Sequence, residues 1–299
     1  MDFAQKAQFF TLDVISDIAF GREFGYLAND KDMFSYIKTT EETIPVMILV
    51  GALPWLAHVL HSRLFKSLLP TDKDVYGLGK VMGIAKEVVG ERFGPNKKEQ
   101  RDMLGSFVRH GLTQREAESE TLMQILAGSD TTASAIRATI LHIITSPHVL
   151  NTLLAEISSA KISNPITDAE ARKLPYLQAV IKEGLRIFPP PVTGLMFKDV
   201  PSGGDTIAGY FVPENTKKGY CAFGLFLDKK LWGEDARIFR PERWLRDSQE
   251  EIRRKETDLE LVFGYGRWQC LGKSVAQVEL NKVFVEVCWR FLFCPVLSF

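Results

Sequence analysis

The chain has 299 residues, 45% of them hydrophobic, and is therefore long enough to bury a large core in one or two domains. Its 37 basic and 37 acidic residues leave no net charge, which argues against a nucleic-acid-binding protein, since such proteins usually carry a basic excess. The four cysteines, at positions 221, 270, 288 and 294, include no C-x-x-C pair, so neither a disulfide scaffold nor a structural zinc site is indicated.

The first 110 residues are predicted to be mostly helical, because apolar residues recur at spacings of three and four. The amphipathic, acidic N-terminus is not typical of a signal peptide. The most apolar run, residues 44–56, contains two prolines and is too short to cross a bilayer. We expect this run to be buried or interfacial, and we expect a charged loop over residues 92–102.

A long helix is predicted next. Thr113 and Glu116 have the spacing of a capping box, which opens a helix, and the apolar pattern continues to about residue 145. Ser146 and Pro147 then end this helix and begin another, since proline is favoured at the first helical position.

A second capping box, Thr167 and Glu170, precedes a helix that we expect to continue through Leu185 until Pro189–Pro191 ends it. Residues 192–222 are punctuated by glycine pairs and are predicted to form short strands. Residues 271–291 are helical again. The predicted fold class is therefore mainly α with a small β-sheet.

The run Ala127–Thr132, sequence AGSDTT, lies inside the long helix although it is rich in poor helix formers. One interpretation is a helix break, with Ser129 or Asp130 capping a second helix. The other is a functional defect, in which a threonine hydroxyl donates to the carbonyl of Ala127 and Gly128 leaves room for a small ligand. An acid and a hydroxyl beside that space could deliver protons.

Glu183 and Arg186 are neighbours on one face of a helix. They could form an exposed ion pair, but the surrounding apolar residues favour a partly buried one, which needs further partners. Arg243, in the run Phe239–Trp244, is a candidate partner. A network of these three charged residues would hold the loop that carries Cys270.

Cys270 lies in a glycine-rich loop just before a predicted helix, with glycines at 264, 266 and 272. The positive end of a helix dipole and its free N–H groups favour a thiolate there. A soft thiolate without a second cysteine nearby is better suited to haem iron than to zinc.

Taken in order, AGSDTT, EGLR, FRPERW and FGYGRWQCLG resemble the C-terminal half of the cytochrome P-450 superfamily, the haem-thiolate monooxygenases. The four motifs also have approximately the spacing seen in that family. The segments DTIAGYFVPENT and FGYGRWQCLGK are most similar to filamentous-fungal members of the pisatin-demethylase type.

The resemblance implies haem as cofactor and a role for each matching residue. Cys270 would be the axial iron ligand, Thr131 the distal alcohol that helps to protonate bound dioxygen, and Asp130 its acidic neighbour. Other residues would contact the haem or brace the fold: Phe263, Gly266 and Gly272 beside the haem, and Glu183, Arg186 and Arg243 as the structural network. Family members usually place arginine two residues before the cysteine; here Trp268 stands there, so Arg267 is the candidate contact to a haem propionate.

The implied activity is insertion of one oxygen atom from O2 into an apolar small molecule, in fungal secondary metabolite biosynthesis. The implied electron donor is an NADPH-dependent reductase. Against the family pattern, residues 1–299 are expected to be a single partial domain that lacks the membrane anchor and early helices at one end and a strand pair at the other. Longer relatives are anchored in the endoplasmic reticulum membrane. The alternatives are an inactive haem-binding remnant and a non-redox haem-thiolate isomerase or dehydratase.

Overall fold

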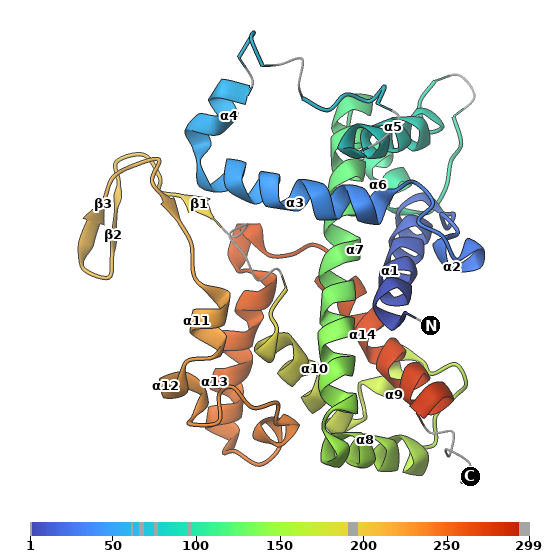
Figure 1. The fold of residues 1–299 in the computed structure, drawn as a ribbon, viewed down its shortest axis with the longest axis vertical. Coiled ribbons are helices and arrows are strands. Elements are labelled where there is room, and N and C mark those ends of the chain that lie inside the picture. The colour runs from blue at the N-terminus through green and yellow to red at the C-terminus, as the bar shows by residue number, and fades with distance from the viewer. Residues whose placement is uncertain are drawn as a thin grey trace. The chain divides into compact units, whose positions relative to one another are not determined.

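The computed structural model describes residues 2–60, 62–65, 69–74, 77–94, 97–190 and 197–292. The chain forms two compact units, Met1–Ala133 and Ser134–Phe299, each of which is described by itself. The fold is mainly helical with short strands, as predicted (Figure 1).

Within the described residues, the regular secondary structure of the first unit is all helical. Its helices are α1 (Phe3–Phe20), α2 (Tyr26–Asn29), α3 (Tyr36–Ala52), α4 (Pro54–Leu60), α5 (Gly77–Gly90), α6 (Met103–Arg109) and the first part of α7 (Gln114–Ile144). Helix α1 begins at its N-cap Asp2 and ends at Gly21, whose φ of 69° is in the left-handed region that favours glycine. Its buried face, which includes Phe9 and Leu12, packs in the core of this unit.

Helix α2 is held by a carboxylate from another helix. Asp13, on α1, accepts from the backbone N–H groups of Tyr26 (2.9 Å) and Leu27 (2.8 Å), which are orphan donors at the start of α2. The negative charge also lies at the positive end of this short helix. Asp13 therefore ties the loop after α1 to the first unit.

The apolar run of residues 44–56 is not buried, in contrast to one of the two expectations for it. Val46 is 54% exposed and Trp55 is 62% exposed. Pro45 lies within α3, and Leu53, which is not helical, separates α3 from α4. The charged segment of residues 92–102 is non-helical between α5 and α6 where it is described, as predicted.

Helix α7 is continuous from Gln114 to Ile144, so the interpretation of AGSDTT as a helix break is wrong. The capping box is present, because Thr113 N–H donates to Glu116 Oε2 over 2.8 Å and Glu116 N–H donates to Thr113 Oγ1 over 3.3 Å. Tertiary packing outweighs the poor helix propensity of this run. The helix contains the boundary between the two units.

The second unit holds the rest of α7 and most of the short elements. Its further helices are α8 (Pro147–Ser159), α9 (Asp168–Ala171), α10 (Pro175–Ile187), α11 (Ala222–Phe226), α12 (Lys229–Trp232), α13 (Gln249–Leu259) and α14 (Lys273–Val287), and its strands are β1 (Lys198–Asp199), β2 (Asp205–Ile207), β3 (Tyr210–Val212) and β4 (Lys217–Lys218). Helix α10 contacts α8, α13 and α14. It is the central helix of this unit.

One predicted helix is two. The capping box of Thr167 and Glu170 is formed, but it opens only the short α9. A separate helix, α10, begins at Pro175. The residue before a proline is biased away from helical geometry, and Leu174 has an extended ψ of 98°. The stop at Pro189 and Pro190 is observed after Ile187, while Pro191 lies outside the described residues.

The predicted strands form two antiparallel pairs. In one, Lys198 lies opposite Lys218, and in the other, Ile207 lies opposite Tyr210. Both residues of the turn between β2 and β3 have positive φ, 51° at Ala208 and 85° at Gly209, which suits a tight hairpin. Residues 191–196, where the strand region was expected to begin, lie outside the described part.

Helix α14 occupies most of the predicted C-terminal helix and is followed by a π-helical turn, Cys288–Leu292. In the part of the chain that the structure describes, no single helix has the length and apolar character needed to cross a membrane. The bent pair of α7 and α8, at 103° to each other, meets that criterion only when the two are taken together.

Candidate functional site

Cys270 lies at the end of a closed backbone loop. Its N–H donates to the carbonyl of Phe263 over 2.7 Å, which brings the two ends of the loop together. Gly264 has a φ of 73°, and a Cβ there would lie 2.9 Å from the carbonyl oxygen of Trp268, so the loop requires glycine at this position. The thiol is free and exposed, and α14 begins three residues later, at Lys273.

Large exposed side chains lie on both sides of Cys270 in the sequence. Leu271 is 97% exposed, Tyr265 is 76% exposed and Trp268 is 66% exposed. Large apolar side chains grouped on a surface typically mark a site that another molecule covers. Around Cys270 they would suit a flat apolar group.

The loop and its donor fit a haem. The exposed thiol of Cys270 is a suitable soft ligand for its iron. A Cβ at Gly266 would meet no atom within 4 Å, and one at Gly272 would meet only the Cys270 Sγ, at 3.8 Å, so this backbone is open to close approach. Among the described residues, no group of three or more His, Cys, Asp or Glu side chains could hold a metal ion.

One basic residue, Arg267, lies within the loop, and another, Lys273, follows it. The guanidinium of Arg267 lies over the ring of Trp268, 5.2 Å from its centroid. The ammonium of Lys273 pairs with Glu260 and lies 5.6 Å from the ring centroid of Phe263. Arg267 thus contacts Trp268, the residue at the position where members of the resembled family usually have arginine.

Glu183, Arg186 and Arg243 are brought together in the second unit. Arg186 donates from Nε to Glu183 Oε2 (2.9 Å) and from Nη2 to Glu183 Oε1 (2.7 Å), while Arg243 donates from Nε to Glu183 Oε1 (3.0 Å). All three side chains are fully buried, so the exposed ion pair considered above is not what forms. Charge-assisted bonds in bidentate geometry are the strong kind.

The remaining donors of this network bind backbone carbonyls. Arg186 Nη1 donates to the carbonyls of Phe226 and Ala236, both over 2.7 Å, and Arg243 Nη1 donates to that of Trp232 over 2.9 Å. These hydrogen bonds hold residues 226–238. The loop of Cys270 is held mainly by hydrogen bonds between its own backbone groups. The sequence led us to expect that the network would hold this loop directly, but the described hydrogen bonds of the network do not reach it.

Two members of this cluster were not predicted. Trp244 donates from Nε1 to Glu183 Oε2 over 3.0 Å, and the Arg240 N–H donates to Glu183 Oε1 over 2.9 Å. Both residues belong to the run FRPERW, so its proximity to Glu183 was anticipated, but only Arg243 was assigned a contact. The indole N–H of a buried tryptophan needs an acceptor, which is the signal that could have identified Trp244.

Thr131 and Asp130 lie on α7 in the first unit, whereas Cys270 lies in the second. The Thr131 hydroxyl donates to the carbonyl of Ala127 over 2.9 Å, as the second interpretation of AGSDTT predicted. Its other part, room for a small ligand beside Gly128, is wrong, because a Cβ there would lie 2.7 Å from Cγ1 of Ile15, which fills this space. Asp130 accepts from the Tyr36 hydroxyl over 3.0 Å and from the side-chain amide of Gln8. Neither Tyr36 nor Gln8 was predicted to be near it.

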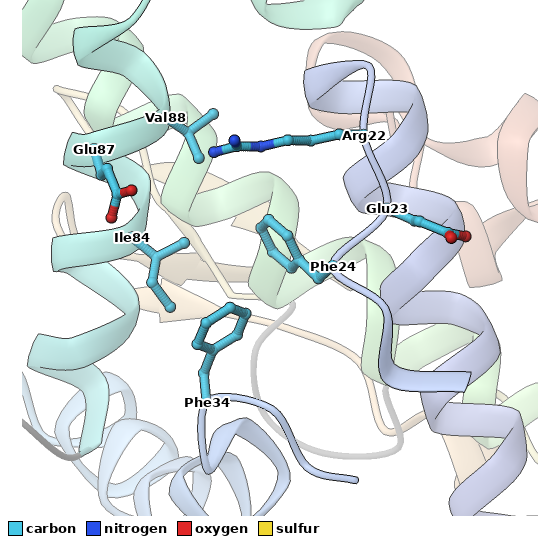
Figure 2. Close-up of a pocket in the computed structure, with 7 residues that line it drawn as sticks. All are labelled: Arg22, Glu23, Phe24, Phe34, Ile84, Glu87 and Val88. Carbon is cyan, nitrogen blue, oxygen red and sulfur yellow. The ribbon is translucent and has the colours of Figure 1, made fainter. Parts of the chain in front are cut away.

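Each unit also contains a cavity. In the first, a cavity of about 260 Å³ lies between the loop after α1 and helix α5; Figure 2 shows Phe24 and Phe34 next to each other and Arg22 extending toward Val88. In the second, a cavity of about 530 Å³ is lined by parts of α10, α13 and α14 and by Phe263. Phe263 is the predicted site residue that borders a cavity.

The other cysteines differ from one another. Cys221, expected to be buried, is exposed, and its Sγ accepts from the N–H of Gly224 over 3.3 Å at the start of α11. Cys288 is buried, as expected, and burial raises the pKa of its thiol to about 12. Cys294 lies outside the described residues.

Comparisons with known proteins place the chain in a family. The family model described as Cytochrome P450 matches residues 1–296. Cytochrome P450 monooxygenase ABA1 of Pyricularia oryzae is 46% identical over 299 residues, covering 98% of this chain and 58% of the relative. Cytochrome P450 monooxygenase aba1 of Botryotinia fuckeliana is 43% identical over 298 residues, covering 97% and 58%.

A solved cytochrome P450 structure, of CYP102L1, has a similar fold, with a TM-score of 0.71 at 22% identity; the match covers 96% of this chain and 61% of that one. The chain thus spans about three fifths of the length of these proteins. The family predicted from the motifs is confirmed, as are its filamentous-fungal relatives and the fold class, and haem with a cysteine thiolate ligand is the cofactor of this family. The chain belongs to the cytochrome P450 family.

Proposed function

We propose that this chain provides the haem-binding part of a monooxygenase that inserts one oxygen atom from O2 into an apolar small molecule. The reaction consumes the substrate, O2, two electrons from NADPH and two protons, and it yields the hydroxylated product and water. The observation that carries the proposal is the free, exposed thiol of Cys270 in a closed glycine loop, in a chain that belongs to this family.

Cys270 would bind the haem iron as a thiolate. When bound, haem with a cysteine ligand supplies O2 chemistry, and electron donation from the thiolate favours cleavage of the O–O bond. The chain's own contribution is to hold the sulfur in place through the N–H bond from Cys270 to Phe263, with apolar side chains such as Trp268 and Leu271 available to cover the haem. Arg267 is our candidate for contact with a propionate.

Asp130 and Thr131 would hold and pass on the protons that the proposed reaction consumes. The Thr131 hydroxyl is held by the Ala127 carbonyl, where it can accept one proton and pass on another. The carboxyl of Asp130 is the group beside it that can take a proton from water and return it. A positioned acid of this kind typically accelerates a step by about 10²- to 10⁴-fold.

Glu183, Arg186 and Arg243 would act structurally. By binding the carbonyls of residues 226–238, they order the segment that leads from the strand pairs to α13. Phe263 and the loop of Cys270 follow α13 directly. The network would thus support the loop through the chain that precedes it.

The partners we propose are an NADPH-dependent reductase, as the family resemblance implies, and an apolar substrate. We also propose a role in fungal secondary metabolism, as the resemblance of the motifs implies; the relatives found are fungal cytochrome P450 monooxygenases. We also propose that residues 1–299 form part of one cytochrome P450 domain.

The proposal is tested by purifying the full chain with haem supplied, reducing it, and recording the carbon monoxide difference spectrum. We expect the band typical of a thiolate-ligated haem. Cys270→Ser should lose this band, whereas Cys221→Ser, which also changes an exposed cysteine, should keep it. Absence of the band from the unaltered chain would favour the inactive alternative.

Turnover is tested by adding a reductase and NADPH and comparing the unaltered chain with Thr131→Ala. We expect the variant to consume NADPH while releasing more hydrogen peroxide and less oxygenated product. Unchanged coupled product formation would instead favour an isomerase, a dehydratase or a peroxide-driven enzyme.

A further inference from the structure

The hydroxyl of Tyr36 connects helix α3 to Asp130 on α7 within the first unit. It lies 3.0 Å from Asp130 Oδ2 and 2.9 Å from Ser129 Oγ. Ser129 Oγ lies 2.9 Å from the carbonyl oxygen of Ile125. Tyr36 is 1% exposed and Ser129 is fully buried, so these groups satisfy one another rather than water.

With Asp130 ionised, the hydrogen bonds can all point toward the carboxylate. Ser129 donates to the Tyr36 oxygen, and Tyr36 donates to Asp130 Oδ2. The other carboxylate oxygen, Oδ1, accepts from the side-chain amide of Gln8 on α1. A carboxylate can only accept, and both of its oxygens then have donors.

With Asp130 protonated, the same groups can point the other way. Asp130 donates from Oδ2 to the Tyr36 oxygen, Tyr36 donates to Ser129 Oγ, and Ser129 donates to the Ile125 carbonyl. Only the hydroxyl protons rotate, and no heavy atom has to move. Neither state leaves a buried donor or acceptor unsatisfied, which would carry a free-energy cost.

Tyr36 is itself held firmly and stays neutral. Asp32 accepts from the backbone N–H of Tyr36 over 2.7 Å, and Thr40 donates to the Tyr36 carbonyl over 2.8 Å. Burial, and next the nearby charge of Asp130, raise the pKa of Tyr36 well above its usual value. Its hydroxyl therefore keeps the proton that the chain of hydrogen bonds requires.

We propose that Tyr36 is a positioning residue for Asp130, and that with Ser129 it keeps the carboxyl hydrogen-bonded in place both before and after this group gives up its proton. The inference rests on the proposed function, in which Asp130 delivers protons. The two hydroxyls would allow the Asp130 carboxyl to lose and regain a proton repeatedly, because its side chain does not have to rotate to keep a hydrogen-bond partner in either state.

The first test does not depend on turnover. In protein labelled with ¹³C at Cζ of tyrosine, the Tyr36 resonance should move when Asp130→Asn is introduced, because the Tyr36 hydroxyl lies 3.0 Å from Asp130 Oδ2. Tyr26 is a matched internal control, since it is also 1% exposed in the first unit and packs on the ring of Phe9. A Tyr36 resonance that responds no more than that of Tyr26 overturns the proposal.

The second test measures coupling with reductase, NADPH and a fluorogenic apolar alkyl ether whose dealkylation is followed. Tyr36→Phe should lower product per NADPH about tenfold and raise hydrogen peroxide, with KM unchanged within about twofold, because only proton delivery is disturbed. Tyr26→Phe should match the unaltered chain. Equal coupling in the two variants overturns the proposal.

If Tyr36→Phe fails to give the carbon monoxide band, Ser129→Ala replaces it, with an expected loss of coupling of about threefold, since it removes the acceptor needed only when Asp130 is protonated. If Asp130→Asn lowers product per NADPH but neither Tyr36→Phe nor Ser129→Ala does, the positioning role alone is overturned. Unchanged coupling in both Asp130→Asn and Thr131→Ala overturns the proposed proton delivery, and the positioning role with it.

Discussion

Arg243 donates from Nε to Glu183 Oε1 over 3.0 Å, and both side chains are fully buried. Arg186 shares the same carboxylate, so two guanidinium groups face one negative charge. Asp235 lies 3.3 Å from Arg243 and supplies a second carboxylate. Although burial alone would raise it, Arg243 and then Arg240 hold the pKa of Asp235 below its usual value. The excess positive charge is thus matched by Asp235 and by backbone carbonyls.

Glu183→Gln should destabilise the protein strongly. Removing the charge leaves two buried guanidinium groups without their shared carboxylate, and breaking a buried pair in this way typically costs about 3–5 kcal/mol. Urea unfolding followed by circular dichroism would measure the loss. The matched control is Glu234→Gln, which removes a carboxylate from an exposed pair with Lys229 and should change the midpoint little. Similar midpoints for the two variants would contradict this account.

Gly184→Ala should disturb the contact between α10 and the C-terminal part of α7. A Cβ at Gly184 would lie 2.0 Å from Thr139 Oγ1, which is far inside van der Waals contact. Overpacking of this kind costs about 1–3 kcal/mol. The thermal midpoint should fall, and the double variant Gly184→Ala, Thr139→Ala should recover part of the loss, since the nearest atom is removed. Additive losses would argue against the clash.

Gly264→Ala should reduce haem retention more than Gly266→Ala. Both glycines have positive φ, 73° and 65°, so both variants carry backbone strain. Only at Gly264 does the new Cβ also meet a backbone atom, the Trp268 carbonyl oxygen at 2.9 Å. The ratio of bound haem to protein, with the size of the carbon monoxide band, measures the difference. Equal retention would show that space around the loop does not matter.

His142 should make stability fall at mildly acidic pH. Burial first, with the nearby Arg186, lowers the pKa of His142 below 6.5, its ordinary value. Below about pH 6.5 the unfolded chain binds a proton that the folded chain does not, so the free energy of unfolding decreases as pH falls from 6.5 toward the folded-state pKa. His142→Phe should flatten this slope.

The phenylalanine should retain the stacking on Phe239, whose ring centroid lies 4.8 Å away and almost parallel. Urea midpoints of the two proteins from pH 5 to 8 provide the comparison. Near pH 8, where His142 is neutral in both the folded and the unfolded chain, the difference between the two midpoints should no longer change with pH. An unchanged slope in the variant would assign the pH dependence to other groups.

Local features of the fold could be predicted from the sequence, because a few adjacent residues determine them. The capping boxes at Thr113 and Thr167 formed as expected. Pro175 was a local signal too, and overlooking it merged α9 with α10. Propensity alone was misleading at AGSDTT, where packing keeps α7 continuous.

Only the site residues that lie in the four ordered motifs could be predicted from the sequence. Glu183 and Arg243 are 60 residues apart, and the order of the motifs, rather than any local pattern, pointed to their contact. Tyr36 and Gln8 lie 94 and 122 residues from Asp130, in no recognised motif. The partly buried carboxylate of Asp130 finds its partners through the tertiary fold, so these two could not be predicted from sequence spacing.

The indole of Trp244 has a consequence for spectroscopy. It is buried against Glu183, with the ring of Trp232 5.7 Å away, while Trp55, in the first unit, is largely exposed. In a Trp55→Phe background, every remaining indole belongs to the second unit. The shift of emission to longer wavelength on unfolding would then report the second unit alone, and circular dichroism, which sees both, would show whether the two halves of the chain melt together.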